Sequence, residues 1–379
     1  MMLGIYIHIP FCVKKCGYCD FVSVTDTKLA EAYFSALDKE IALSAKLHPD
    51  RVDTVFLGGG TPSLPDEKYI AGLLSRLRAH YAVCEDAEVT LEGNPCTFTP
   101  EKLAAYRRHG VNRLSIGFQA AQDELLSLLG RRHTAAQFDE AYDMARAAGF
   151  ETINVDVIYA IPGQTMRQWE DTLHHVLYKK PEHISAYALK IEDGTPLAGS
   201  IRRGEIAPAS SDMDADMYGM AQGMLAEKGY INYEVSNFAL WDRECRHNLK
   251  YWNLGNYLGL GVSAHSNIGN LRFANTDDIA AYINNLKGGG LRYASSQLID
   301  ESERKFEYIM LKMRLKQGIA YREYFDLFGE QFEKGRARQI EKAMKYGLVY
   351  MDERGVRPTA KGFALQSTLV HVLTEKEGA

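Results

Sequence analysis

The sequence predicts an α/β fold, a partial (β/α)6 barrel followed by a C-terminal α+β region. Two observations predict it. Across the first 190 residues, short runs rich in β-branched residues alternate with amphipathic stretches of helical length, which is typical of parallel strands joined by crossover helices. After this region the alternation stops. Six strand–helix units are too few to close an eight-stranded barrel, so we expect an open barrel.

The units follow one another along the chain with short connections. The predicted strands are 4–9, 52–57, 88–93, 112–118, 152–159 and 183–189, and the predicted helices are 28–47, 66–79, 100–109, 122–148 and 165–178. The carboxyl ends of parallel strands meet at one mouth of such a barrel. Polar residues that end these strands are therefore expected to lie close together.

The change of pattern places a domain boundary near residue 195. We expect the barrel to occupy residues 1–195 and a connecting α/β region to occupy 196–300. Residues 301–379 read as helices followed by two short strands around a polar turn, which resembles a winged-helix-like module. Because this module lacks a basic recognition helix, a lid or packing role is favoured over DNA binding.

The composition excludes some classes of partner and suggests a compartment. The 44 Lys and Arg residues are evenly mixed with 49 Asp and Glu residues, so no basic stripe is available and nucleic acid is not an expected partner. The first residues lead directly into a predicted strand without the features of an export signal, so we expect no export, and no run approaches the length of a membrane span. Three of the six cysteines fall within eight residues, which favours metal binding in a reducing cytoplasm over a disulfide framework.

The strongest chemical signal is the group Cys12, Cys16 and Cys19, directly after the first predicted strand. Soft thiolate ligands at this spacing suit zinc or an iron–sulfur cluster. A fourth cysteine does not follow, since position 21 is Phe21, so an iron–sulfur cluster here would keep one iron open to an outside ligand. The alternative is a structural Cys3His zinc site that recruits His8.

The CxxxCxΦC pattern, with Tyr18 as its aromatic residue, resembles the motif of the radical S-adenosylmethionine (SAM) superfamily. The resemblance implies a [4Fe-4S] cluster on Cys12, Cys16 and Cys19, with SAM chelating the fourth iron. The glycine-rich segment after the second strand is similar to the motif that binds the amino group of SAM in this superfamily. The residues that carry this similarity are Gly59, Gly60 and Thr61.

Polar residues stand in or at the ends of the third, fourth and fifth strands, namely Glu92, Asn94, Gln119 and Asp156. Buried polar groups need partners, so their convergence indicates a polar ligand. Their order and spacing also resemble the oxygen-independent coproporphyrinogen III oxidase-like family. This resemblance implies that SAM contacts Tyr6, Tyr18, Glu92, Gln119, Arg131 and Asp156, with Arg131 facing its carboxylate.

The segment that begins at His247 reads HNLKYW and resembles the HNxxYW signature of the heme chaperone branch of this family. The true oxidases carry a further cysteine where this chain has Phe21, which favours the chaperone branch. By this resemblance His247 is the candidate ligand of heme iron, and imidazole is a common axial ligand. Cys245 and His265 are alternative ligands, and a structural role for His247 is the competing interpretation.

Two functions follow from the resemblance. The preferred hypothesis is a heme chaperone that binds the cluster, SAM and heme and delivers heme to apo-hemoproteins. The rival is an oxygen-independent coproporphyrinogen III dehydrogenase, a radical enzyme that decarboxylates propionate side chains. No catalytic residue is assigned. The resemblance adds an electron donor as a partner and leaves open a homodimer and a transient membrane contact.

Overall fold

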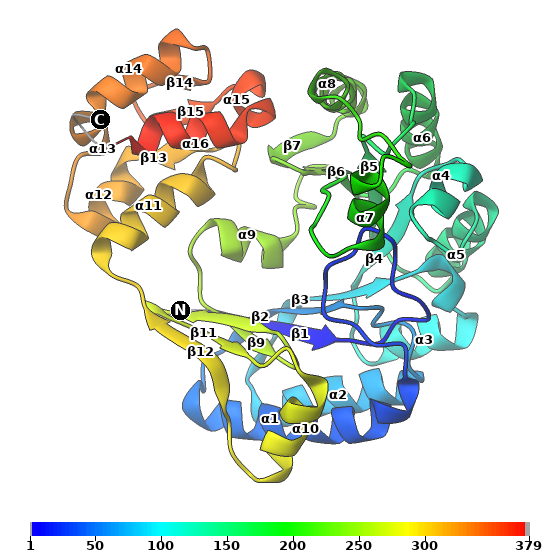
Figure 1. The fold of residues 1–379 in the computed structure, drawn as a ribbon. Coiled ribbons are helices and arrows are strands. Elements are labelled where there is room, and N and C mark those ends of the chain that lie inside the picture. Colours follow the sequence, from blue (N-terminus) through cyan, green and yellow to red (C-terminus); the bar gives the residue numbers. More distant parts are fainter. Residues whose placement is uncertain (1, 376–379) are drawn as a thin grey trace.

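One strongly curved sheet organises the computed structural model, which describes residues 2–375 (Figure 1). Six neighbouring strands of this sheet are parallel and follow the order of the chain, as predicted. They are β1 (Leu3–Ile9), β2 (Val52–Gly59), β3 (Val83–Gly93), β4 (Arg113–Gln119), β5 (Thr152–Tyr159) and β6 (His183–Ala188). The α/β fold with an open barrel is confirmed.

Helices cover the convex face of the parallel strands (Figure 1). Each turns an apolar stripe to the sheet; in the first of them Tyr33, Leu37 and Ile41 are buried at helical spacing. These helices are α1 (Ala30–Leu47), α2 (Glu67–His80), α3 (Pro100–Arg108), α4 (Asp123–Leu128), α5 (Ala135–Ala147) and α6 (Met166–Lys179), with short 3-10 turns η1 (Thr27–Leu29) and η2 (Pro95–Thr97).

The single helix predicted over 122–148 is wrong, because the structure has two helices there. The break follows Leu128, where Gly130 adopts a left-handed backbone with φ of +75°. A new helix, α5, then begins after Thr134, the N-cap residue whose side chain forms a capping box with Gln137. The loop between the helices carries Arg131, so the break brings that side chain to the mouth of the barrel.

The sheet continues beyond the six parallel strands at both edges, to twelve strands in the described residues. Beside β1 lie the parallel β9 and then antiparallel neighbours; beside β6 lies a short hairpin. The added strands are β9 (Tyr257–Leu260), β10 (His265–Ile268), β11 (Leu271–Asn275), β12 (Tyr293–Leu298), β8 (Asn237–Ala239) and β7 (Ile231–Glu234). The sheet thus crosses residue 195, and the domain boundaries stay predictions.

The helices of the connecting region pack around this sheet. They are α7 (Pro196–Arg202), α8 (Ser211–Glu227), α9 (Arg246–Trp252) and α10 (Ile279–Lys287). Of these, α9 lies on the concave side, inside the curve of the sheet (Figure 1). Its position is important because α9 carries the His247 motif.

The C-terminal residues form a separate small module with its own core, which includes Tyr308, Ile340 and Val356. The two short strands predicted around a polar turn are present. The elements are α11 (Glu301–Lys312), β13 (Ile319–Ala320), α12 (Tyr321–Phe328), α13 (Phe332–Gly335), α14 (Ala337–Lys345), β14 (Val349–Met351), β15 (Gly355–Pro358), α15 (Ala360–Ala364) and α16 (Gln366–Thr374). Within residues 2–375, no helix has the length and apolar character that crossing a membrane requires.

Candidate cofactor site

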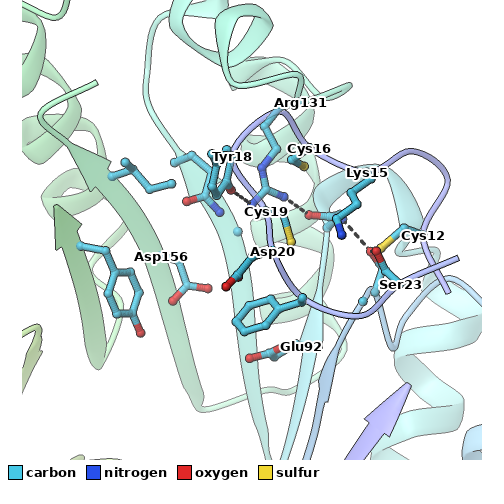
Figure 2. Close-up of a pocket in the computed structure, with 18 of the residues that line it drawn as sticks. Cys12, Lys15, Cys16, Tyr18, Cys19, Asp20, Ser23, Glu92, Arg131 and Asp156 are labelled. Atoms are coloured by element: carbon cyan, nitrogen blue, oxygen red, sulfur yellow. Dashed lines mark hydrogen bonds between the residues drawn. The ribbon is translucent and has the colours of Figure 1, made fainter. Parts of the chain in front are cut away.

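A cavity of about 460 Å³ opens at the carboxyl ends of the parallel strands. Most of the residues predicted from the sequence line it. They are Cys12, Cys16, Tyr18, Cys19, Gly59, Gly60, Thr61, Glu92, Gln119, Arg131 and Asp156. Figure 2 shows the three cysteines on one loop, with Glu92 and Asp156 below that loop in this view. Tyr6 and His247 are the two predicted residues that do not line this cavity.

The cysteine loop, residues 10–23, is held by backbone hydrogen bonds to its surroundings. The amide of Cys12 donates to the carbonyl of Val24 at 3.0 Å, and the amide of Gly17 donates to the carbonyl of Leu129 at 3.0 Å. The ring of Tyr18 packs on a small apolar cluster from β5 and α4. These contacts fix the loop against the barrel, so its three thiols face the same cavity.

The glycine loop after β2 fits closely against the start of the cysteine loop. The amide of Gly60 donates to the carbonyl of Ile9 at 2.9 Å, and a Cβ on Gly60 would lie 2.8 Å from that oxygen. Gly59 has a φ of +106° and donates its amide to Glu92 Oε2 at 3.3 Å. Since both amides are engaged, the polar groups that these glycines can offer a ligand are carbonyl oxygens, which suit an ammonium group.

Arg131 is the main cation inside the cavity. Its guanidinium donates to Asn94 Oδ1 at 2.5 Å and to the Tyr18 hydroxyl at 2.6 Å. Asn94 in turn donates to Thr61 Oγ1 at 3.0 Å. The Nε of Arg131 is buried and has no partner among the described residues. A buried guanidinium with an unsatisfied nitrogen and no carboxylate partner is suited to bind the carboxylate of a ligand.

Two carboxyl groups form the floor of the cavity. Burial, followed by the neighbouring Asp156 charge, raises the pKa of Glu92 to about 8. Burial also raises the pKa of Asp156, although Asn154 and Ser115 donate hydrogen bonds to its oxygens at 2.8 and 3.1 Å. Such groups can accept from a hydroxyl or an ammonium donor of a bound ligand.

Two further predicted residues take different positions. Gln119 lines the cavity at the end of β4 with a φ of 73°, an unusual conformation for a residue other than glycine. Tyr6 lies one layer deeper, where its ring stacks with that of Phe56 at 6.3 Å and its hydroxyl lies 3.2 Å from His8 Nδ1. Tyr6 therefore supports the floor beneath Glu92, and it does not face the cavity.

His247 lies away from the cavity, fully buried on the side of α9 that faces the sheet. Its Nδ1 lies 2.9 Å from Thr54 Oγ1 and its Nε2 lies 2.9 Å from the hydroxyl of Tyr251. Thr54 precedes Gly59 by five residues on β2, which is about 16 Å of strand. Burial, with smaller effects from Lys250 and Arg113, lowers the pKa of His247 to about 3. Neither ring nitrogen is available to a heme iron in this conformation.

The rest of the motif on α9 also makes structural contacts. Both oxygens of Glu88 accept backbone amides at the start of α9, at 3.0 Å each. At the other end, the ring of Trp252 lies 4.7 Å from the guanidinium of Arg314, which follows α11 in the C-terminal module. The motif thus bridges the barrel and that module.

The alternative metal ligands predicted from the sequence lie at separate places in the structure. Cys245 is buried and donates to Glu88, whereas His265 is exposed at the start of β10. His8, the fourth ligand that a zinc site would need, has Nδ1 near Tyr6 and Nε2 within 2.8 Å of the carbonyl of Val22. No three His, Cys, Asp or Glu side chains in residues 2–375 are grouped to hold one metal ion.

Some lining residues were not singled out from the sequence. The sequence indicates Asn94 as a polar strand end but does not indicate that it bridges Arg131 and Thr61. Ser115 faces the cavity two residues before Gly117, and alternation along β4 would have found it. Tyr187, near the end of β6, lines the opposite flank, and no motif marks it.

Comparison with known proteins identifies relatives over nearly the whole chain. Residues 6–176 match the radical SAM superfamily and residues 299–365 match the HemN C-terminal domain. The "Heme chaperone HemW" of Mycobacterium tuberculosis (strain ATCC 25618 / H37Rv) is 38% identical, with 83% of this chain and 82% of that protein aligned. The protein of the same name from Lactococcus lactis is 33% identical, with 95% and 94% aligned.

A mouse mitochondrial protein and one solved structure extend the comparison. "Radical S-adenosyl methionine domain-containing protein 1, mitochondrial" of Mus musculus is 31% identical, over 98% of this chain and 87% of that protein. The structure of coproporphyrinogen III oxidase (HemN) from Escherichia coli, described as a radical SAM enzyme, superposes with a TM-score of 0.85 at 25% identity. It covers 98% of this chain and 90% of that one.

Proposed function

Because this chain belongs to the HemW family of the radical SAM superfamily, we propose that it binds a [4Fe-4S] cluster, SAM and heme, and delivers heme to apo-hemoproteins. The observation that carries the proposal is the convergence of three free thiols, a buried guanidinium and two buried carboxyl groups on one cavity. The relatives are named heme chaperones, which is why we propose heme as the cargo.

The residues of the cavity fit the cofactor pair. Cys12, Cys16 and Cys19 would hold three irons of the cluster, since no other thiol lines the cavity in the described part of the chain. Arg131, with its unpartnered Nε, would bind the carboxylate of SAM. The carbonyl oxygens of Gly59 and Gly60 would accept from its ammonium group. When bound, the cluster and SAM supply one-electron chemistry.

The chain's own contribution is binding, orientation and the exclusion of water. The hydrogen bonds from Arg131 to Asn94 and Tyr18 hold the guanidinium in one orientation, so little freedom is lost when it binds an anion. Glu92, which is largely protonated at neutral pH in the free cavity, would give up its proton when an ammonium donor sits beside it.

The second candidate is an oxygen-independent coproporphyrinogen III dehydrogenase, which the superposition on coproporphyrinogen III oxidase favours. Phe21 argues against it, because the oxidases carry a cysteine at this position. An anaerobic assay for protoporphyrinogen formation separates the two candidates. Robust turnover would rule out a pure carrier.

We propose a cytoplasmic protein, because all six cysteines are free thiols. The recipients would be apo-hemoproteins, and an electron donor would act on the cluster. A homodimer and a transient membrane contact remain hypotheses.

The test is a hemin titration of the anaerobically reconstituted protein, followed through the Soret band. We expect stoichiometric binding, and then transfer of the band to an added apo-hemoprotein. A protein that binds no hemin, with cluster and SAM in place, would contradict the chaperone proposal.

A further inference from the structure

The mouth of the cavity carries exposed aromatic side chains. Phe21, at the end of the cysteine loop, is 61% exposed, and Tyr187, on β6, is 40% exposed, although both line the cavity. β1 and β6 are the first and last of the six parallel strands that follow the order of the chain, so these residues lie on the two flanks of the opening. Large aromatic side chains are usually buried. Two that face one opening indicate a surface for a flat, apolar ligand.

The same rim carries more free cations than free anions. Lys14 and Lys15 line the cavity, are exposed, and have no ion-pair partner among residues 2–375. Lys190 also lines it but pairs with Glu192. Because Glu92 and Asp156 lie on the floor of the cavity, Asp20 is the remaining acidic group of the rim. In a chain of net charge -5, this local excess of positive charge suits an anionic ligand.

We infer that heme binds at this mouth, with a porphyrin face against Phe21 and Tyr187 and its two propionates toward Lys14 and Lys15. The inference rests on the proposed function and names the site of the cargo. The cavity volume of about 460 Å³ supports a rim position, because it falls within the range of a pocket for one drug-sized ligand. SAM would fill the interior of the cavity, so heme would bind at the rim, beside Phe21 and Tyr187.

No histidine lines the cavity in the described residues, and both ring nitrogens of His247 are engaged elsewhere. The heme is therefore held through its face and propionates, without a histidine–iron bond. This arrangement suits a carrier, because release breaks no coordination bond to an imidazole. In this arrangement the iron contributes little to the affinity for heme, and the two propionate carboxylates contribute much.

The test compares three ligands on the anaerobically reconstituted protein: hemin, metal-free protoporphyrin IX and the dimethyl ester of protoporphyrin IX. We expect protoporphyrin IX to bind within about threefold of hemin, and the ester to bind about tenfold more weakly, a loss near 1.4 kcal/mol. If hemin binds and metal-free protoporphyrin IX does not, a protein ligand to the iron is required, and the inference that heme is held without one is wrong.

Variants locate the site. Phe21→Ser, Tyr187→Ser and the double variant Lys14→Gln/Lys15→Gln should each weaken hemin about tenfold, as expected for central contacts. The matched controls are Tyr178→Ser, a residue 83% exposed on the outer helix α6, and Lys39→Gln/Lys46→Gln on the exposed side of α1. These controls should stay within twofold of the wild type. Iron content and SAM affinity, measured on every variant, show whether the cavity is intact.

The outcomes separate the two proposals. If the wild type binds hemin and all three rim variants bind it equally well, the rim site is wrong and the chaperone function stands. If the Phe21 and Tyr187 variants lose SAM and keep hemin, these residues belong to the SAM site and the inference is overturned. A wild type that binds no hemin overturns both.

Discussion

The Nδ1 atom of His247 lies 2.9 Å from Oγ1 of Thr54, a residue 193 positions earlier in the chain. The ring of His247 also stacks on Phe56 at 5.4 Å. The histidine therefore fastens α9 to the concave face of β2. The signature that suggests a heme ligand in the sequence serves in the structure as a brace between α9 and the sheet.

The contacts of His247 should contribute to the stability of the folded protein. Replacing His247 with Ala removes two buried hydrogen bonds and an aromatic contact, so the free energy of unfolding should fall by about 2–4 kcal/mol. Urea unfolding measures the change. Tyr251→Phe, which removes one hydroxyl, should cost about 1 kcal/mol. Unchanged stability together with a lost Soret band would restore His247 as the heme ligand.

Acid should destabilise the protein partly through the same residue. Folding lowers the pKa of His247 to about 3, so the folded state keeps the ring neutral while the unfolded chain takes up a proton near its ordinary pKa. The stability is thus full above about pH 6.5 and falls as the pH drops toward 3. His133, whose pKa is lowered to about 4, acts in the same direction. Urea unfolding at several pH values should show a shallower decline in His247→Ala.

Glu92 should act in the opposite direction. Burial raises its pKa in the folded state to about 8, so folding retains a proton that the unfolded chain loses near pH 4.5. The resulting stability is full below 4.5 and is lost as the pH rises through 8. Glu92→Gln should flatten this decline and make the cofactor-free protein more stable at pH 9 than the wild type. Thermal unfolding at pH 5, 7 and 9 measures it; parallel curves for the two proteins would contradict the assignment.

Arg131 should control the affinity for SAM. Arg131→Lys keeps the charge but loses the planar fork that contacts Asn94 and Tyr18, so SAM should bind at least about tenfold more weakly. The matched control is Arg132→Lys at the neighbouring exposed position, which should change the affinity less than twofold. Calorimetry on the reconstituted protein decides. Equal losses in the two variants would show that the guanidinium of Arg131 has no specific role in binding SAM.

The cluster should depend on Cys16. Cys16→Ala should reduce the iron content from about four atoms per chain to near zero and remove the absorbance near 400 nm. Cys84→Ala, a thiol outside the cavity, should retain both. Iron retained in full by the Cys16 variant would show that the ligand assignment is wrong.

The features that depend on local order can be predicted from the sequence. The alternation of apolar runs reports strands and helices because side-chain periodicity follows backbone geometry, and the six parallel strands appeared where it predicted. The spacing of Cys12, Cys16 and Cys19 places three thiols on one short loop whatever surrounds them. Residues that end parallel strands, such as Glu92, must lie near one another at the mouth of the barrel.

The features that depend on pairing between distant segments follow from the packing of the whole chain. β9 lies beside β1 although about 250 residues separate them, and no periodicity in either strand indicates the partner. Whether His247 faces a ligand or a neighbouring strand depended on where α9 packs. Arg131 lies at the cavity because the helical conformation is interrupted at Gly130. Local sequence sets what a side chain can do, and long-range packing sets what it meets.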